Sequence, residues 1–245
     1  MSEVQVVRLP DAATLAREAA DRAVAVLQAA LEERGEAHLV VTGGGILEKV
    51  LGGLARPDAL DWSRVHVWWG DERYVPADSD DRNDRPAMSL LFDHVPVDPA
   101  RLHRMPAADA GFGDDVEAAA DSYAAELAAV APDGADVPVF DLILLGVGPD
   151  GHCASLFPGH PGTRVLDAAV IAVHDSPKPP PIRLSLTFPT LDAADQVWFV
   201  ASGDGKADAV ARAVGGAPRE EVPSAGPRGR SGTVWLVDED AAAKL

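Results

Sequence analysis

The residues with the clearest chemical potential lie in a glycine-rich segment, Gly146–His152, which reads Gly-Val-Gly-Pro-Asp-Gly-His. This segment follows the apolar run Asp141–Leu145. A histidine placed there can exchange protons near neutral pH, and the glycines allow the backbone to approach a substrate closely. Asp150 can help to orient the region. A lone histidine is more often structural, but this context favours a catalytic role for His152.

A second glycine-rich segment, Thr42-Gly43-Gly44-Gly45, follows the run His38–Val41 and precedes a helical pattern. Successive glycines let backbone amides converge on an anion, and a helix N-terminus adds partial positive charge. The segment is neither a dinucleotide fingerprint nor a P-loop, because the closing glycine and the P-loop lysine are both missing. It is interpreted as a phosphate-binding turn, with a simple tight turn as the alternative.

A third segment, Gly70-Asp71-Glu72-Arg73, follows the run Val65–Trp69 in the same manner. The carboxylate of Asp71 and the guanidinium of Arg73 can orient hydroxyl groups or bind an anion. A surface turn with an internal ion pair is the alternative, and by itself the more common one. Asn83, at the end of an acidic loop, is equally ambiguous.

Two further cations stand beside turns. Arg183 precedes the run Leu184–Phe188, and Lys206 opens a helical pattern after Ser202–Gly205. A lysine near a helix N-terminus opposes the helix dipole, so its placement there favours an anionic partner. Solvated surface charges remain the alternative for both residues.

Cys153, the single cysteine of the chain, directly follows His152. Adjacent residues at a turn between a strand and a helix point apart, so we interpret Cys153 as a buried small residue rather than a nucleophile. The seven histidines are dispersed, and no histidines or cysteines have the spacing of a zinc site. The sequence therefore predicts neither a metal nor an organic cofactor.

The elements that must position these residues are predicted from apolar runs. Most runs are nearly continuous rather than alternating, which is typical of strands buried on both faces of a parallel sheet. The seven predicted strands are Val4–Val7, His38–Val41, Val65–Trp69, Asp141–Leu145, Ala169–Val173, Val197–Ala201 and Thr233–Val237. Helical patterns occupy Asp11–Arg34, Ile46–Ala55, Asp84–Phe92, Asp114–Val130, Lys206–Val214 and Glu239–Leu245.

Strands that alternate with helices predict an α/β fold: a doubly wound, mostly parallel sheet flanked by helices on both faces. No repeat or linker divides the chain, so residues 1–245 are expected to form a single domain. Ligands of such sheets bind beyond the carboxyl ends of the strands. The loops Val75–Pro86 and His174–Pro181 are long enough to be binding loops at that edge.

Composition narrows the class of protein. The 245 residues are 47% hydrophobic, which is ample for one sizeable core, and the net charge is −18. Such a charge disfavours nucleic acid and anionic membranes as partners. The N-terminal residues lack the basic region of a signal peptide, no apolar run approaches the roughly 18 to 20 residues of a membrane span, and one cysteine fits a reducing compartment. We expect a cytoplasmic monomer or weak homodimer that acts on a small molecule.

Taken together, these motifs resemble the 6-phosphogluconolactonase family. The segment Gly148–Pro158 is closely similar to the family signature, and the resemblance runs from about Val4 to Leu245. The other matching blocks, in order, are Asp71-Glu72-Arg73 with Val75-Pro76 and Asn83, Arg183 with Leu184–Pro189, and Gly203–Ala207.

The resemblance implies a modified Rossmann fold shared with glucosamine-6-phosphate deaminases and other sugar-phosphate isomerases. It also implies hydrolysis of 6-phospho-D-glucono-1,5-lactone to 6-phospho-D-gluconate in the oxidative pentose phosphate pathway. By the same resemblance, His152 is the general base, and Asp71 and Arg73 line the site. Arg183 and Lys206 hold the phosphate, together with amides of the glycine loop.

The chain departs from the family pattern at two places. Ile46 follows Gly45 where the family commonly has serine or threonine, and Cys153 stands where threonine is usual. Two other functions remain as alternatives: a glucosamine-6-phosphate deaminase-like enzyme and a non-catalytic sugar-phosphate sensor. Deaminases normally have tyrosine at the position of Arg73 and continue differently after His152, and a sensor does not need the base.

Overall fold

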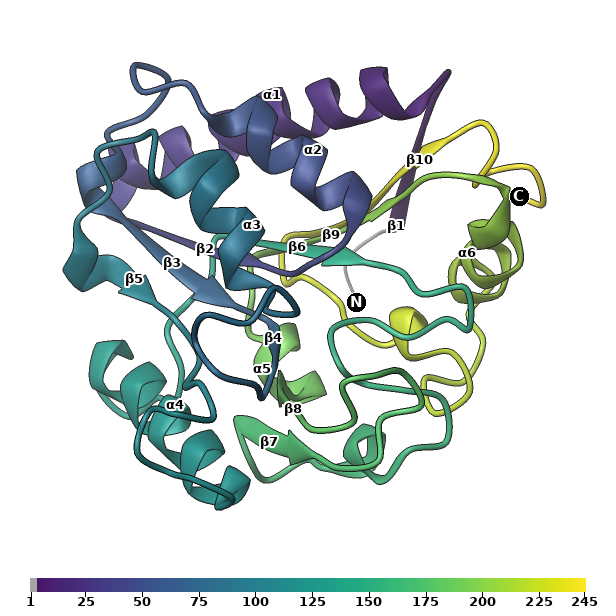
Figure 1. Cartoon of the computed structure of the whole chain (residues 1–245). Coiled ribbons are helices and arrows are strands. Elements are labelled where there is room, and N and C mark those ends of the chain that lie inside the picture. Colours follow the sequence, from purple (N-terminus) through teal and green to yellow (C-terminus); the bar gives the residue numbers. More distant parts are fainter. Residues whose placement is uncertain (1–3) are drawn as a thin grey trace.

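Six of the seven predicted strands form one parallel sheet in the computed structural model, which describes residues 4–245 (Figure 1). A short strand that the sequence did not predict, β5, joins the sheet at one edge. The strands are β1 (Val4–Leu9), β2 (Ala37–Val41), β3 (Val65–Trp69), β5 (Leu102–His103), β6 (Leu142–Gly146), β9 (Gln196–Ala201) and β10 (Gly232–Asp238). Their order is β1-β10-β9-β6-β2-β3-β5, so the first strand pairs with the last.

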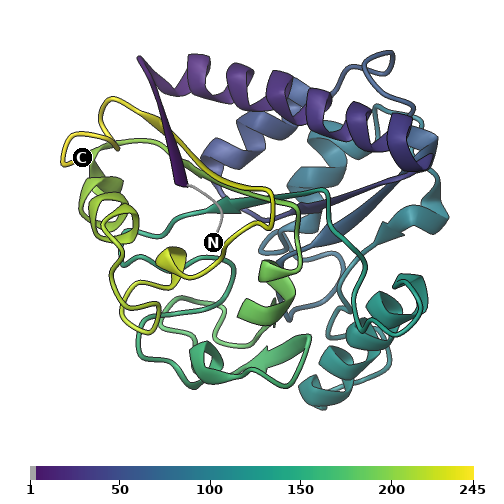
Figure 2. The ribbon, with the colours of Figure 1, turned by 180° about the vertical axis from the view of Figure 1, so that it is seen from behind.

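Helices cover both faces of this sheet, which confirms the predicted α/β architecture. In Figure 1, α1, α2 and α3 lie above the sheet, and α4 and α5 lie below it; Figure 2 shows the same layers from behind. The α-helices are α1 (Ala12–Arg34), α2 (Gly45–Leu54), α3 (Asp84–Ala87), α4 (Val116–Val130), α5 (Phe188–Asp192) and α6 (Ala207–Val214). Short 3-10 turns occupy Trp62–Arg64, Pro99–Arg101, Pro161–Arg164, Asp204–Lys206 and Pro223–Ala225, and a π-helical turn follows α3 at Met88–Phe92.

Helix α1 illustrates why the sequence forms these elements. Its N-cap, Asp11, accepts a hydrogen bond from the amide of Thr14 at 2.7 Å, and its C-cap, Gly35, has the left-handed φ of 80°. Between the caps, leucines and alanines recur every three or four residues and form one buried face against the sheet and α2. Since most are alanines, the helix can pack closely on its neighbours.

The seventh predicted strand lies elsewhere. β7 (Val170–Val173) pairs antiparallel with β8 (Arg183–Leu186), and β8 pairs antiparallel with β4 (Asp71–Arg73). The prediction that Ala169–Val173 belongs to the parallel sheet was therefore wrong. Parallel neighbours need a crossover connection, usually a helix, whereas β7 and β8 are joined by a loop that folds back. This small sheet sets Arg73 opposite Arg183.

The predicted C-terminal helix Glu239–Leu245 was also wrong, because these residues form turns. Asp238 organises them: its carboxylate accepts a hydrogen bond from the amide of Ala241 at 2.9 Å, and its carbonyl accepts one from Ala242. A segment this short has little room to propagate a helix after the cost of nucleation. The same carboxylate also binds the turn after β9, which borders the site described next.

None of the helices within residues 4–245 has both the length and the apolar composition that crossing a membrane requires.

Candidate active site

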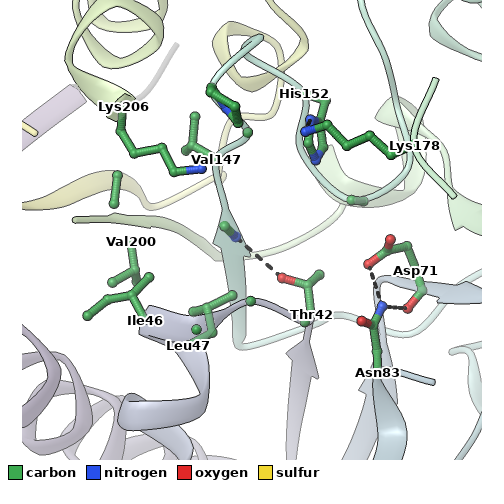
Figure 3. A pocket seen from close by; sticks show the side chains of 18 of the residues that line it. Thr42, Ile46, Leu47, Asp71, Asn83, Val147, His152, Lys178, Val200 and Lys206 are labelled. Carbon is green, nitrogen blue, oxygen red and sulfur yellow. Dashed lines mark hydrogen bonds between the residues drawn. The ribbon is translucent and has the colours of Figure 1, made fainter. Parts of the chain in front are cut away.

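A pocket of about 510 Å³ opens at the carboxyl ends of four neighbouring strands, β9, β6, β2 and β3 (Figure 3). It lies where the winding of the sheet reverses. From β2 the chain proceeds outward through β3 and β5, then returns to β6 and proceeds the other way through β9 and β10. Such a switch point is where open α/β sheets bind their ligands.

The structure brings nearly all of the predicted site residues to this pocket. Those that line it are Thr42, Gly43, Gly44, Gly45, Asp71, Arg73, Asn83, His152, Arg183 and Lys206. Asp150 does not line the pocket and instead contacts His152 from behind. Both predicted loops contribute, Val75–Pro86 through Asn83 and His174–Pro181 through Lys178 and Pro179.

The glycine loop presents the N-terminus of α2 to the pocket. Gly44 is the N-cap, with a φ of 132°, and no side chain caps the helix, so its first amides are free to bind an anion. A Cβ on Gly43 would collide with the side chain of Asn83. The hydroxyl of Thr42 donates to the carbonyl of Leu144 at 3.0 Å, so in this geometry it joins the loops after β2 and β6.

His152 and Asp150 form a pair in the loop after β6. Nδ1 of His152 lies 2.5 Å from Oδ1 of Asp150, which assigns the Nδ1–H tautomer to the neutral ring and leaves Nε2 without a proton. Although burial opposes ionisation, the hydrogen bond and the charge of His152 hold the pKa of Asp150 well below its ordinary range. A Cβ on Gly148 would overlap both side chains, so glycine there is a requirement of the pair.

Phe157 packs against the imidazole of His152, with ring centroids 4.8 Å apart. Cys153, the next residue along the chain, is fully buried, and burial raises the pKa of its thiol. Both observations agree with the interpretation of Cys153 as a packing residue. Ala154, which lines the pocket, has a positive φ of 47° and so turns the chain sharply beside the histidine.

Asp71 and Asn83 form a polar wall opposite the histidine. The amide nitrogen of Asn83 donates to the carbonyl of Asp71 at 3.1 Å, and Ser155 donates to the Asp71 carboxylate at 2.7 Å (Figure 3 shows the Asn83 contacts). Nη1 of Arg73 donates to Oδ1 of Asn83 at 2.6 Å. Among residues 4–245, no hydrogen bond engages Nη2 of Arg73.

Glu72 supports this wall from below, a role that sequence reasoning missed. It is fully buried and accepts hydrogen bonds from the amides of Arg73, Asn83 and Asp84 at 2.6–2.9 Å. Burial raises the pKa of Glu72 to about 7, partly offset by the charge of Arg82. The Asp-Glu-Arg motif is therefore divided: Asp71 and Arg73 face the pocket, and Glu72 holds the loop that carries Asn83.

Arg183 is 5% exposed and lies over the ring of Phe157. Nε and Nη2 donate to three carbonyls of the facing loop, those of Lys178, Pro179 and Pro180, at 3.1–3.2 Å. In the described part of the chain, Nη1 has no such partner. Arg183 thus holds the loop and leaves one nitrogen for a ligand.

Lys206 reaches the pocket from the opposite side, at the start of α6 (Figure 3). Burial, together with the charge of Lys178, lowers the pKa of its ammonium group. Asp238 braces the turn before it, because its carboxylate accepts from the hydroxyl of Ser202 at 2.5 Å and from the amide of Gly203 at 3.0 Å.

The pocket is strongly cationic on an acidic protein. Its lining holds five lysines and arginines and one carboxylate, although the chain as a whole carries a net charge of −18. The cations are Lys49, Arg73, Lys178, Arg183 and Lys206. Across residues 4–245, no histidine, cysteine and carboxylate side chains gather in a group that could hold a metal ion. The arrangement suits a small anionic ligand.

A histidine–aspartate pair and a cationic pocket at the switch point of a parallel sheet are typical of an α/β enzyme for a small anionic substrate. The family model for glucosamine-6-phosphate isomerases/6-phosphogluconolactonase matches residues 10–235. The chain therefore belongs to the glucosamine-6-phosphate isomerase/6-phosphogluconolactonase family.

Relatives support the same assignment. The chain is 51% identical over 241 residues to a 6-phosphogluconolactonase of Streptomyces coelicolor, covering 96% of this chain and 92% of that protein. It is 48% identical over 237 residues to a 6-phosphogluconolactonase of Mycobacterium tuberculosis, covering 96% of each. Among solved structures, 6-phosphogluconolactonase from Thermotoga maritima superposes with a TM-score of 0.84 at 30% identity, covering 96% of this chain and all of the other.

Proposed function

We propose that this chain hydrolyses 6-phospho-D-glucono-1,5-lactone to 6-phospho-D-gluconate, the lactonase step of the oxidative pentose phosphate pathway, with His152 as the general base. The observation that carries the proposal is the His152–Asp150 pair, 2.5 Å apart, inside a pocket lined by five cations. Relatives about 50% identical over nearly the whole chain are named 6-phosphogluconolactonases, which supports the substrate.

The reaction begins when water attacks the C1 carbonyl of the lactone. Because Nδ1 of His152 faces Asp150, Nε2 is the nitrogen that accepts the proton of that water. The C1–O5 bond of the tetrahedral intermediate then breaks, and the imidazolium returns its proton to O5, which becomes the C5 hydroxyl. The new carboxyl group at C1 ionises to solvent.

Negative charge develops on the carbonyl oxygen during the attack, so a donor nearby accelerates the reaction. Nη2 of Arg73 is the candidate, since no hydrogen bond commits it within the described chain. Asp71 and Asn83 are placed to bind hydroxyl groups of the sugar acid, because their side chains line the same wall.

The phosphate is held by Lys206, by Nη1 of Arg183 and by amides of Gly43, Gly44 and Gly45. Charge-assisted hydrogen bonds of this kind fix the remote end of the substrate and so position C1 near the base. All of these groups come from one chain, so a monomer or a weak homodimer suffices for activity. A reducing cytoplasm is the compartment that we propose, in keeping with the buried thiol of Cys153.

The test is a hydrolysis assay with freshly generated 6-phospho-D-glucono-1,5-lactone, corrected for its spontaneous hydrolysis. We expect turnover well above that background. Ammonia release from glucosamine 6-phosphate without lactone hydrolysis would instead identify a deaminase. Binding of 6-phosphogluconate without any turnover would identify a sensor.

A further inference from the structure

Lys178 is a cation of the pocket whose position the proposed mechanism does not yet explain. Its Nζ lies 3.2 Å from Nδ1 of His152 and 3.4 Å from Oδ1 of Asp150 (Figure 3). It comes from the loop between β7 and β8, far along the chain from the loop after β6. Nδ1 is not the nitrogen that accepts the proton from water. An ammonium group beside Nδ1 therefore changes the electrostatic environment of the base and does not contact the substrate.

The loop delivers Lys178 to a fixed place. The carbonyl of Lys178 accepts from the hydroxyl of Ser176 at 3.0 Å and from Nη2 of Arg183 at 3.1 Å, and its amide donates to the same hydroxyl at 3.3 Å. The amide of Ser176 in turn donates to the carbonyl of Pro181 at 2.9 Å. Because the backbone is bound on both sides, the side chain reaches the His152–Asp150 pair from a constrained anchor.

The two neighbours of Nδ1 have opposite effects on the ring. Asp150 fixes the tautomer but also stabilises the protonated imidazolium, which cannot act as a base. Lys178 carries a positive charge that destabilises the imidazolium. Even with the dielectric screening of water, a unit charge at this distance shifts a protonation equilibrium by about one pH unit.

We propose that Lys178 is a positioning residue that offsets the charge of Asp150, so that the carboxylate orients His152 without also favouring its protonated form. The inference rests on the proposed role of His152 as base. It assigns three members to the catalytic unit: a ring, an anion that orients it and a cation that keeps it unprotonated.

Other charged groups around the pocket act more weakly on the ring. Lys206 faces Lys178 and Asp150 from the start of α6, and its lowered pKa reflects burial and the charge of Lys178. Asp71, Arg73 and Arg183 line the remaining walls. Within residues 4–245, only Asp150 and Lys178 make a polar contact with the imidazole.

The experiment compares Lys178→Met with the wild type, measuring kcat and KM between about pH 5 and 9, the range in which histidines titrate. We expect the acidic limb of the kcat profile to move upward by about one pH unit, with kcat on the alkaline plateau and KM changed less than about threefold. Lys178→Arg, which keeps the charge, should restore most of the wild-type profile. Lys244→Met removes the same charge from the surface, where Lys244 pairs with Asp208, and should shift nothing.

Two results would overturn the proposal. An acidic limb that stays in place shows that Lys178 does not act on the base. A rise of KM of about tenfold at every pH shows a substrate contact instead, since uniform loss of binding raises KM and leaves the pH profile unchanged.

A second readout does not depend on lactone turnover. Nuclear magnetic resonance of the ligand-free protein follows the titration of the His152 ring, assigned with His152→Asn. The midpoint should rise in Lys178→Met, or in Lys178→Gln if the methionine variant does not fold. A wild type without lactonase activity would refute the proposed function, whereas an unchanged midpoint in the variant refutes the role of Lys178.

Discussion

Histidine occurs in two contrasting regions of the molecule, singly in the pocket and as a group of three inside the sheet. His152 lies beyond the carboxyl end of β6, in a glycine-rich loop, with an ionised partner and access to a pocket. The histidine stack, formed by His38, His66 and His103, lies within β2, β3 and β5 of the same sheet. His38 and His66 are only 8% and 12% exposed at their side chains.

The rings of the histidine stack are held for packing. His38 and His66 lie 4.6 Å apart and nearly parallel, and Trp68 stacks on His103 at 3.6 Å. Nε1 of Trp68 donates to Nδ1 of His38, and His103 contacts Glu126 at 2.6 Å. Each ring therefore has a structural partner and no route to a substrate.

The difference teaches that residue type does not identify a catalytic histidine. In the stack, burial and neighbouring charges lower the pKa of His38 to about 3 and that of His66 to about 4, so both stay neutral and inert. In the pocket, an opposed pair of charges surrounds a ring that solvent can reach. The position at the end of a strand, rather than the histidine itself, separates the two.

The largest expected effect is on catalysis. His152→Asn should lower kcat by roughly 10²–10⁴-fold, as loss of a general base does, while phosphate binding and the free energy of unfolding stay near the wild-type values. Steady-state kinetics and denaturant unfolding measure the two quantities. Near-normal turnover in this variant would show that His152 is not the general base. The pocket histidine would then be no more catalytic than the histidines of the stack.

Acid should lower the free energy of unfolding through the buried histidines of the stack. The folded-state pKa values of His38 and His66 lie below the unfolded value of 6.5, so the unfolded chain takes up protons first as the pH falls. The stability present above pH 6.5 is thus lost between 6.5 and about 4 for His66, and down to about 3 for His38. From pH 7 to 5 these two histidines together should lower the free energy of unfolding by about 3–4 kcal/mol. Protonation of the buried Glu72, whose folded-state pKa of about 7 lies above its ordinary value of 4.5, opposes this by about 2 kcal/mol, so we expect a net fall of about 1–2 kcal/mol.

Urea unfolding at both pH values measures this loss. His38→Phe should remove about half of the contribution of the two histidines and change kcat at neutral pH less than about twofold. His152→Asn, a control from the other region, should leave the pH dependence of stability intact. A His38→Phe variant whose stability depends on pH as that of the wild type does contradicts the assignment of the stack.

The cations of the pocket should affect binding more than stability. Lys206→Ala should raise KM about tenfold or more, because it removes a charge-assisted hydrogen bond to the phosphate, and Arg183→Ala should do the same. Arg183→Ala should also lower kcat, since it frees the loop that carries Lys178. Kinetics with the phosphorylated lactone measure both effects.

The control substrate is D-glucono-1,5-lactone, which lacks the phosphate. For this substrate the Lys206→Ala defect should shrink, and the double variant should be non-additive on the phosphorylated one, because both residues bind one group. Normal binding of the phosphorylated lactone by both single variants would refute the phosphate site without refuting lactonase activity.

The last prediction is that removal of metal ions has no effect on activity. Exhaustive treatment with EDTA should leave kcat and KM unchanged, because acid–base chemistry at His152 needs no metal. The measurement is the lactone assay before and after chelation. Loss of activity that a divalent ion restores would contradict this expectation.

The sequence predicts the frame of the fold better than its small sheet. The runs that became β2 and β3 are apolar apart from one histidine each, and this pattern can be recognised without knowledge of the tertiary structure. By contrast, β4 has three residues and β5 has two, too few for a periodic signal. Their pairing is decided by what the rest of the chain places beside them.

The same reasoning explains the site. The turns after β2, β3, β6 and β9 could be located because each follows a recognisable strand. Lys178 could not, because its contacts with Asp150 and His152 span 28 and 26 positions of the chain. Its only signal was membership of the proline-rich loop His174–Pro181. The role of Glu72 was missed because the sequence around a polar turn does not show whether a carboxylate is buried or exposed.

The pairing of β1 with β10 bears on how the protein is made. A ribosome releases β1 before the other strands of the sheet, whereas the strand that pairs with it, Gly232–Asp238, emerges after all of them. Until then β1 has no neighbour in the sheet, and Asp238 cannot brace the turn that carries Lys206. Contacts so distant along the chain slow folding. A nascent chain cut short before Gly232 therefore retains His152 but lacks a finished pocket, so activity requires that β10 has been made.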